Sequence, residues 1–259
     1  MLSLLTNQHI FVSTGEKKSA RVLKFLGKEN STVINNGVDY EHIRNIPISR
    51  SEALKLCNSE NWGANKILGT ISRLSPEKGV IILLEAFSKA IKKSPNIRLI
   101  IVGGYPEEHK NYFLKIKNFI DKENLSEYIR ILEYRQDALE ILKCFDFYIS
   151  SSLSEGLPIS ILEAVASNIP TIATEITGNK DILSNSVFGI LATPNSPESL
   201  FKAIIKMAQL NSSELAIITH NALNRVKNNF SVKEMVNKTT LTYNQVLNKK
   251  TRLKSNCFN

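Results

Sequence analysis

The sequence contains few cysteines, and they follow no recognisable pattern. Three cysteines occur in 259 residues, widely separated along the chain: Cys57, Cys144 and Cys257. The disulfide framework of a small secreted domain needs several closely spaced pairs, and a zinc site needs short ligand spacings. The cysteine content therefore excludes both classes and predicts a reducing compartment, with Cys144 packed in the core.

Long apolar runs are also lacking. No segment approaches the ~18 consecutive apolar residues of a membrane span. The N-terminal stretch MLSLLTNQHIFV lacks the basic start and the long apolar run of a signal peptide. We therefore expect a cytoplasmic protein.

Several catalytic patterns are absent from the sequence. The four histidines are scattered along the chain, so they indicate no metal-binding or catalytic pair. No G-x-G-x-x-G dinucleotide fingerprint follows the apolar run 97–104. The aspartates are Asp39, Asp121, Asp137, Asp146 and Asp181, and no two of them form an Asp-x-Asp motif. The sequence therefore predicts neither a metal nor a cofactor.

The charge balance is basic, with 33 lysines and arginines against 24 acidic residues and a net charge of +9. Such a balance suits phosphate ligands, nucleic acid or an anionic membrane. No nucleic-acid motif accompanies the basic residues, and most fall on predicted helix faces or in the tail 249–254. We expect solvated helix faces and no nucleic-acid partner, with weak peripheral contact at the inner face of a membrane as the minority interpretation.

Apolar runs alternate with amphipathic segments along most of the chain. This alternation predicts an α/β protein with a doubly wound parallel sheet. The expected strands are 9–13, 32–34, 66–72, 97–104, 145–149, 171–175 and 188–191, and the run 128–150 reads as strand, short helix, strand. The expected helices are 16–26, 51–57, 79–93, 107–123, 197–210, 212–228 and 231–248, with a loop at 61–63 in which Trp62 covers the core edge.

The stretch SSSLSEGLPISILEA at 150–164 is the centre of the predicted site. An apolar strand ends here, the chain turns at Gly156, and a helix starts with Pro158 in its first turn. The free N–H groups of a helix start favour an anion. Glu155 in the loop and Glu163 in the helix are carboxylates that can accept hydrogen bonds from sugar hydroxyls.

A second loop carries cations. Arg73 and Lys78 lie between the predicted strand 66–72 and the helix 79–93. An arginine at the carboxyl end of a strand can bind phosphate oxygens with two parallel hydrogen bonds, while a lysine adds a compact charge. In isolation the two would be ordinary surface cations, but the strand–loop–helix context favours a phosphate site.

Three segments in this order resemble glycosyltransferase family 4, retaining enzymes of the GT-B fold that use nucleotide-diphosphate sugars. Along the chain the segments are ISRLSPEKG at 71–79, SEGLPISILEA at 154–164 and PTIATEITGNKDIL at 170–183, and the resemblance covers most of 33–248. It implies a metal-independent site in which Arg73 and Lys78 bind the diphosphate. In the same way Glu155 would hold the transferred sugar and Glu163 the ribose, while the helix start at Gly156, Leu157 and Pro158 would help to meet the phosphate charge. Arg73, Lys78 and Glu155 would then be catalytic.

The resemblance also implies a division of the chain. Residues 1–38 would be a remnant of the N-terminal acceptor domain, 39–230 the Rossmann-like nucleotide-sugar domain, and 231–259 the crossover helix and basic tail. The acceptor would be a glycan or lipid-linked molecule, and a separately encoded N-terminal domain would complete the enzyme of polysaccharide biosynthesis. The chain departs from the family at Asn35, usually proline, and at Glu133, usually a glycine of the loop that lines the base pocket.

Two alternatives stay open on the sequence. One is a non-catalytic nucleotide-sugar-binding remnant or scaffold. The other, a nucleotide-sugar epimerase or phosphorylase of similar architecture, explains the three ordered matches less well.

Overall fold

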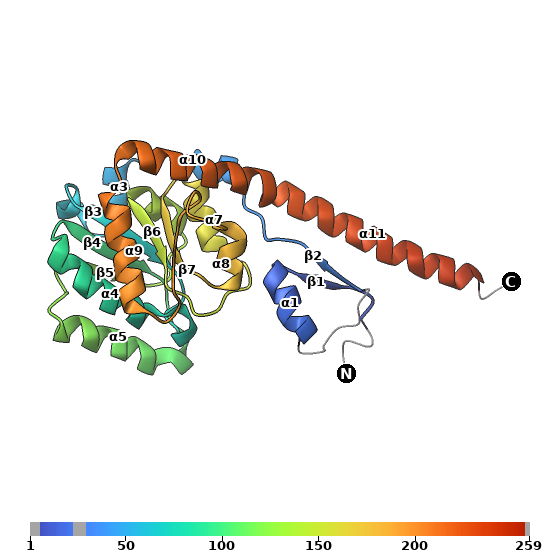
Figure 1. Ribbon diagram of the computed structural model, residues 1–259, viewed down its shortest axis with the longest axis horizontal. Helices are drawn as coiled ribbons and strands as arrows, with labels where there is room; N and C mark the ends of the chain where they lie inside the picture. The colour runs from blue at the N-terminus through green and yellow to red at the C-terminus, as the bar shows by residue number, and fades with distance from the viewer. Residues whose placement is uncertain (1–5, 23–29, 257–259) are drawn as a thin grey trace.

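The computed structural model describes residues 6–22 and 30–256. Its main body is a six-stranded parallel sheet with helices on both faces, in the strand order β5-β4-β3-β6-β7-β8 (Figure 1). The strands are β3 (Lys66–Ile71), β4 (Ile97–Val102), β5 (Ile129–Leu132), β6 (Phe147–Ser150), β7 (Thr171–Thr174) and β8 (Ile190–Ala192). The predicted doubly wound sheet is confirmed, with strand ends shifted by one or two residues.

Alternate side chains of the strands enter two separate cores. Ile67, Ile100 and Tyr148 face one core. Their neighbours Leu68 and Leu99 face the other. Because successive side chains in a strand point to opposite faces, a strand buried on both faces reads as a continuous apolar run.

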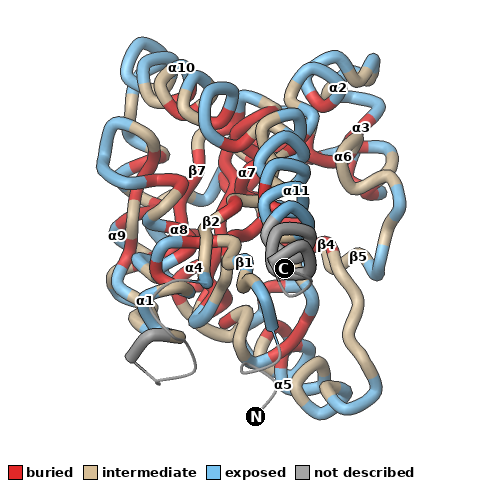
Figure 2. Tube along the Cα trace, turned by 90° about the vertical axis from the view of Figure 1, so that its right-hand side faces the viewer, coloured by how far each residue is buried: buried red, intermediate tan, exposed pale blue. Residues whose placement is uncertain are grey.

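Helices cover both faces of the sheet, as the red interior of Figure 2 shows. One face carries α4 (Val80–Lys93), α5 (Lys110–Lys122) and α9 (Pro197–Gln209). The other carries α2 (Tyr40–Arg44), α3 (Arg50–Leu56), α6 (Ala138–Ile141), α7 (Ile159–Ala166) and α10 (Ser212–Asn229). Reciprocal capping boxes start α3 and α10, so serine or asparagine followed by glutamate three residues later fixes both starts.

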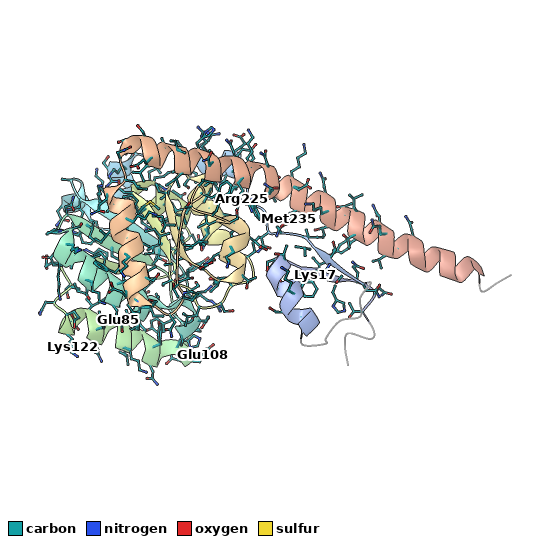
Figure 3. The ribbon with its side chains drawn as sticks, viewed as in Figure 1. Lys17, Glu85, Glu108, Lys122, Arg225 and Met235 are labelled. Carbon is teal, nitrogen blue, oxygen red and sulfur yellow. The ribbon has the colours of Figure 1, made fainter. Side chains whose placement is uncertain are left out.

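The N-terminal strands form a small sheet of their own. β1 (His9–Phe11) and β2 (Ser31–Val33) pair in parallel, with α1 (Thr14–Val22) as their described crossover. The ammonium of Lys17 donates to the carbonyl of Ser31 at 2.6 Å and so ties α1 to β2 (Figure 3). The sequence predicts that this helix extends to Leu26, but residues 23–26 lie outside the described residues.

α1 rests on α8 (Thr177–Ile182), the short helix after β7. The backbone N–H of Thr14 donates to Asp181 Oδ2 at 2.8 Å, and its hydroxyl donates to the same carboxylate. Gly15 lies so close to Thr177 that an added Cβ would stand 1.4 Å from its methyl carbon. These contacts fix the start of α1 on the main body.

The last helix, α11 (Val232–Asn256), leaves the main body and extends past the small sheet (Figure 1). Its start is tied down by Val38, whose N–H donates to Phe230 and whose carbonyl accepts from Val232. We predicted its end at 248, but no glycine or proline follows that position, so nothing in the sequence stops the helix. Among the described residues, no helix has the length and apolar character needed to cross a membrane.

The segment 40–65 is more ordered than predicted. α2 was missed because five residues are too few to show a periodicity. The predicted loop at 61–63 contains a short 3-10 helix, Glu60–Trp62. Trp62 is 2% exposed, with the guanidinium of Arg130 over its ring at 4.5 Å, so its predicted role at the core edge is confirmed.

Within the described residues, further 3-10 helices lie in the connections: Pro76–Lys78, Glu107–His109 and Leu142–Cys144. The second of them replaces the first turn of the predicted helix 107–123, which therefore begins as α5 only at Lys110. Cys144 is buried, as predicted.

Candidate functional site

The three motif segments meet where the strand order reverses. β3 and β6 are neighbours in the sheet but pair over only two positions, Leu68 with Phe147 and Gly69 with Tyr148. Their following helices, α4 and α7, cover opposite faces. Ligands of open α/β sheets bind in the crevice outside the strand ends at this switch point.

The loop after β3 brings Arg73 and Lys78 to this edge. The loop can pass close to the end of β6 because Gly79 adopts φ +64°, and a Cβ there would stand 2.3 Å from the carbonyl oxygen of Ser151. Arg73 is 69% exposed in its side chain and lies 3.5 Å from Glu77 Oε1. Because this ion pair is exposed, it holds Arg73 only weakly.

Glu77 is fixed by the loop itself. The hydroxyl of Ser75 donates to Glu77 Oε1 at 2.5 Å, and this hydrogen bond is the main reason why the pKa of Glu77 is below its usual value. Glu77 therefore stays ionised beside Arg73.

Lys78 and Glu155 form an ion pair across the switch point. Lys78 Nζ lies 2.6 Å from Glu155 Oε1, and their side chains are only 16% and 13% exposed. The hydroxyl of Ser152 donates to the same oxygen at 2.7 Å. Within the described residues, Glu155 Oε2 has no hydrogen-bond partner and is left as a free acceptor. The sequence placed both residues at one edge but did not predict that they pair.

Glu163 lies one helical turn and a half beyond the loop. α7 begins at Ile159 with Pro158 as its N-cap, so our placement of Pro158 in the first turn was one residue early. The carboxylate of Glu163 is half-buried, and burial raises its pKa. In the part of the chain that the structure describes, this carboxylate has no hydrogen-bond or ion-pair partner. A half-buried acceptor without a donor is suited to a ligand hydroxyl.

Tyr148 is close enough to both carboxylates to interact with their charges, and sequence reasoning missed it. Its hydroxyl donates to the carbonyl of Ile71 at 3.2 Å and interacts with Ser160 in the first turn of α7. Burial raises its pKa to about 12, and the charges of Glu163 and Glu155 add to this effect. Tyr148 belongs to the apolar run of a predicted strand, so the sequence indicates a core residue and nothing more at this position.

The segment after β7 supports the loop that carries Glu155. The hydroxyl of Thr174 donates to the carbonyl of Ser152 at 2.5 Å, and the Asn179 amide donates to the carbonyl of Thr174 at 2.9 Å. We predicted a turn at Gly178, but it lies inside α8. The glycine is needed there for a close approach, since a Cβ would stand 2.3 Å from the carbonyl oxygen of Gly156.

The predicted anion site at 156–158 is built from buried backbone. Leu157 and Pro158 are buried, and the carbonyl of Leu157 accepts a hydrogen bond from the Asn36 amide at 2.8 Å. The first N–H groups of a helix have no partner within the helix, so the start of α7 presents donors at this edge.

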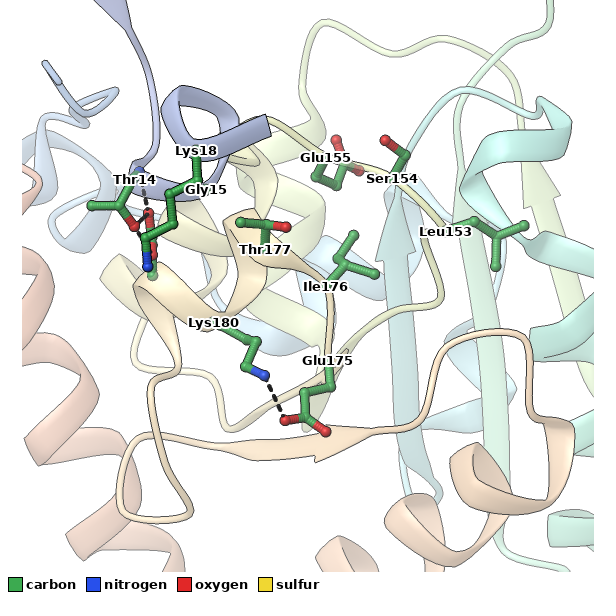
Figure 4. A pocket seen from close by; sticks show the side chains of 11 residues that line it. Thr14, Gly15, Lys18, Leu153, Ser154, Glu155, Glu175, Ile176, Thr177 and Lys180 are labelled. Carbon is green, nitrogen blue, oxygen red and sulfur yellow. Dashed lines mark hydrogen bonds and ion pairs between the residues drawn. The ribbon is translucent and has the colours of Figure 1, made fainter. Parts of the chain in front are cut away.

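A cavity of about 490 Å³ adjoins Glu155, between α1 and α8 (Figure 4). It mixes carboxylates, hydroxyls and lysines, and Lys180 pairs with Glu175 at 2.8 Å inside it. Its lining residues are Thr14, Gly15, Lys18, Leu153, Ser154, Glu155, Glu175, Ile176, Thr177, Lys180 and Asp181. No group of three or more histidine, cysteine, aspartate or glutamate side chains placed to hold a metal ion occurs in the described residues.

Residues 58–225 match the family model "Glycosyl transferases group 1". The chain therefore belongs to the group 1 glycosyltransferases, and its fold is that of the Rossmann-like domain of GT-B glycosyltransferases. It is 30% identical over 231 residues to the UDP-Gal:alpha-D-GlcNAc-diphosphoundecaprenol alpha-1,3-galactosyltransferase of Escherichia coli, covering 84% of this chain and 55% of that protein. It is 23% identical over 217 residues to the capsular polysaccharide biosynthesis glycosyltransferase CapM of Staphylococcus aureus, covering 80% and 53%.

Two solved structures show the same fold. A glycosyltransferase from Rickettsia africae superposes with a TM-score of 0.84 at 25% identity, over 93% of this chain and 64% of that one. Anabaena HepE in complex with UDP and glucose superposes with a TM-score of 0.83 at 24% identity, over 92% and 63%. The chain spans about half the length of the curated relatives it matches.

Proposed function

We propose that the chain is the donor-binding part of a retaining family 4 glycosyltransferase. It would transfer a hexosyl group from a nucleotide-diphosphate sugar to a glycan or lipid-linked acceptor, without a metal ion. The observation that carries the proposal is the ion pair of Lys78 with Glu155, which joins the cation-bearing loop to the carboxylate-bearing loop at the switch point.

The ion pair prepares both residues for a sugar diphosphate. Glu155 Oε1 is taken by Lys78 and Ser152, which fixes the carboxylate and leaves Oε2 for a sugar hydroxyl. Lys78 keeps its remaining N–H donors for a phosphate oxygen. A donor would therefore bridge the two residues, with its sugar at Glu155 and its diphosphate at Lys78.

Charge develops on the diphosphate as the glycosidic bond breaks, and the protein must stabilise it. We assign this role to Lys78, to Arg73 after it leaves its exposed pair with Glu77, and to the N–H groups at the start of α7. Glu163 would hold the ribose, since its carboxylate is half-buried and without a donor in the described structure. Retention would follow from attack on the face that the diphosphate leaves.

The acceptor side would be supplied by further polypeptide that packs against the small β1–β2 sheet and α11. Two strands are too few for an independently stable sheet. α11 exposes Val236, Leu241 and Tyr243 by half or more. A partner domain that covers these side chains would form the other wall of the site, and the net charge of +9 would favour weak contact with the inner face of a membrane.

Titration calorimetry with UDP- and GDP-sugars, with and without a chelator, tests the proposal. We expect metal-independent binding, and Lys78→Met should weaken it about 10- to 100-fold, the scale of one charge-assisted hydrogen bond. Lys89→Met is the matched control, because Lys89 pairs with Glu198 at 2.9 Å on the exposed face of α4. Binding abolished by chelator, or an equal loss in both variants, would contradict the assignment.

Turnover is tested separately. Orienting the acceptor supplies roughly 7–11 kcal/mol of rate acceleration in favourable cases. We therefore expect the chain alone to bind donor but to show little transfer to acceptor extracts, and activity to appear when an acceptor domain is supplied. Robust turnover by the chain alone would place the acceptor site within it.

A further inference from the structure

Two arginines lie together on one face of the sheet without an acidic partner. Arg98 is the second residue of β4, and Arg130 is the second residue of the edge strand β5. In the register of these strands Arg130 pairs with Ile100, two residues beyond Arg98, so the two arginines are diagonal neighbours on the same face. In the part of the chain that the structure describes, neither guanidinium forms an ion pair, although two like charges this close repel each other.

Both guanidiniums lie over the same aromatic ring. The guanidinium carbon of Arg130 is 4.5 Å from the centre of the Trp62 ring, and that of Arg98 is 5.9 Å from it. Arg98 also lies 4.8 Å from the centre of the Tyr128 ring. The face of an aromatic ring attracts a cation, so these rings hold the guanidiniums in place. They do not neutralise them, and two positive charges remain side by side.

The protein satisfies one terminal nitrogen of each guanidinium. Nη1 of Arg98 donates to the carbonyl of Pro95 at 2.8 Å, and Nη1 of Arg130 donates to the carbonyl of Ser126 at 3.1 Å. Among the described residues, Nη2 of either side chain has no hydrogen-bond partner, and the Nε–H of Arg98 is buried and also unpaired. The two guanidiniums are therefore fixed by backbone contacts while they keep unused donors.

The arginine pair lies at the edge of the sheet opposite the donor site. Arg98 is four residues before the end of β4, which is about 13 Å along the strand, whereas the donor site is built at the carboxyl ends of the strands. Pro95 and Ser126 are exposed residues of the connections that lead into β4 and β5, and both arginines are half-buried. A ligand can therefore reach the pair from solvent, on a surface that the proposed function does not use.

We propose that Arg98 and Arg130 form a second anion site, which binds a phosphate dianion. A guanidinium offers parallel N–H groups in the geometry that phosphate oxygens accept. A phosphate dianion balances two guanidiniums, whereas a carboxylate balances only one. Inorganic phosphate and a small phosphate monoester share this chemistry, and the experiment separates them. The inference does not rest on the proposed function, because no residue of the donor site takes part.

Trp62 provides a direct test, because it is the only tryptophan of the chain and its fluorescence reports on this site. Titration of the whole chain with inorganic phosphate or glycerol 3-phosphate, at constant ionic strength, should change the Trp62 emission and reach saturation. Arg98→Met and Arg130→Met should each weaken phosphate binding about 10- to 100-fold, the scale of a charge-assisted hydrogen bond. Arg44→Met is the matched control, since it removes the same charge from the exposed end of α2, and it should bind phosphate like the unaltered chain.

Two further variants and a melting experiment guard against misfolding and against binding at the donor site. Arg130→Lys keeps the charge but loses the paired N–H groups, so it should bind phosphate with intermediate affinity. Lys78→Met impairs the donor site and should keep the full Trp62 response. Phosphate should raise the melting temperature of the unaltered chain more than that of the methionine variants at Arg98 and Arg130, and melts without phosphate show that these variants fold.

The outcomes are distinct. Tighter binding of glycerol 3-phosphate than of inorganic phosphate would identify an organic phosphate as the ligand, and the reverse order would identify free phosphate. A response that persists unchanged in Arg98→Met and Arg130→Met, or that disappears in Lys78→Met, would overturn the inference, because phosphate would then bind elsewhere. An equal response to sodium chloride would also overturn it, since it would mark simple screening. A response to phosphatidylglycerol vesicles without one to either soluble phosphate would replace the proposed ligand with a membrane surface.

Discussion

A Cβ added to Gly178 would stand 2.3 Å from the carbonyl oxygen of Gly156, closer than a side-chain carbon approaches a backbone oxygen. This contact packs α8 directly against the loop that carries Glu155. The same Cβ would lie 3.2 Å from the carbonyl oxygen of Glu155 itself. The position of Glu155 therefore depends on the absence of a side chain at Gly178, which follows the next strand, β7.

Gly178→Ala should displace that loop. In an open helix interior this substitution would add ~1 kcal/mol of stability. Here the clash is with backbone, which cannot rotate away, so we expect a net loss of about 1–3 kcal/mol in the free energy of unfolding. Donor binding should weaken about tenfold, and urea unfolding and donor titration measure the two effects.

Gly63→Ala is the matched control for this substitution. A Cβ at Gly63 would meet only the carbonyl oxygen of Glu60, at 3.6 Å, and its backbone is right-handed helical. It should leave binding unchanged. Equal behaviour of the two variants would show that the approach of Gly178 to Gly156 is not needed to position the loop.

The Lys78–Glu155 pair should show strong energetic coupling in a double-mutant cycle. Either Lys78→Met or Glu155→Leu leaves a largely buried charge without its partner. We expect each substitution to lower the free energy of unfolding by about 1–3 kcal/mol, less than the loss for a fully buried pair because both side chains keep some contact with solvent. The double variant should be more stable than the sum of the two losses predicts. Urea unfolding of the four proteins gives the coupling energy.

The exposed pair of Lys89 and Glu198 supplies the comparison. Its side chains are about half exposed, so its coupling energy should be below ~1 kcal/mol. If both cycles gave the same small value, Lys78 and Glu155 would be no more than a surface contact.

Much of the fold could be predicted from periodicity. The run at 97–104 has no polar alternation, which is typical of a strand buried on both faces. Short elements could not be predicted in this way, as α2 shows. The end of α11 was predicted too early, because no glycine or proline after residue 248 marks where the helix ends.

The site could be predicted only as a set of residue types at one edge. Sequence spacing placed Lys78 and Glu155 each in a loop at the carboxyl end of a strand. That the two strands are neighbours and that the two side chains pair depends on the sheet order and on loop paths that Gly79 and Gly178 permit. Cys57 and Cys144 are far apart in the sequence, yet their thiols interact in the core.

Glu163→Gln should raise the stability of the chain at neutral pH while it weakens UDP binding. Burial raises the pKa of Glu163, so the folded chain binds a proton more readily there than the unfolded chain does. Ionisation of Glu163 therefore lowers the free energy of unfolding as the pH rises from the ordinary glutamate pKa of the unfolded chain through the raised pKa of the folded chain. The variant should melt higher than the unaltered chain at pH 7.5, by about 1–3 °C, and the difference should shrink toward pH 4.

The same substitution should weaken UDP binding about tenfold, because an amide offers one acceptor oxygen where the carboxylate offers two. UDP affinity of the unaltered chain should fall on acidification as Glu163 becomes protonated. Glu127→Gln, at an exposed loop position, is the control and should change neither quantity. A Glu163→Gln chain that binds UDP normally would remove Glu163 from the site.

Asp181→Ala should release α1 from the main body. Asp181 accepts hydrogen bonds from both the N–H and the hydroxyl of Thr14, and these are the polar contacts that fix the start of α1 on α8. Limited proteolysis should cut the segment 9–22 at least several-fold faster in the variant, while the parallel sheet of the main body stays protected. Asp121→Ala, on the exposed face of α5, is the matched control and should leave the cutting rate unchanged. An unchanged rate in Asp181→Ala would show that the packing of Gly15 on Thr177 holds α1 without the carboxylate.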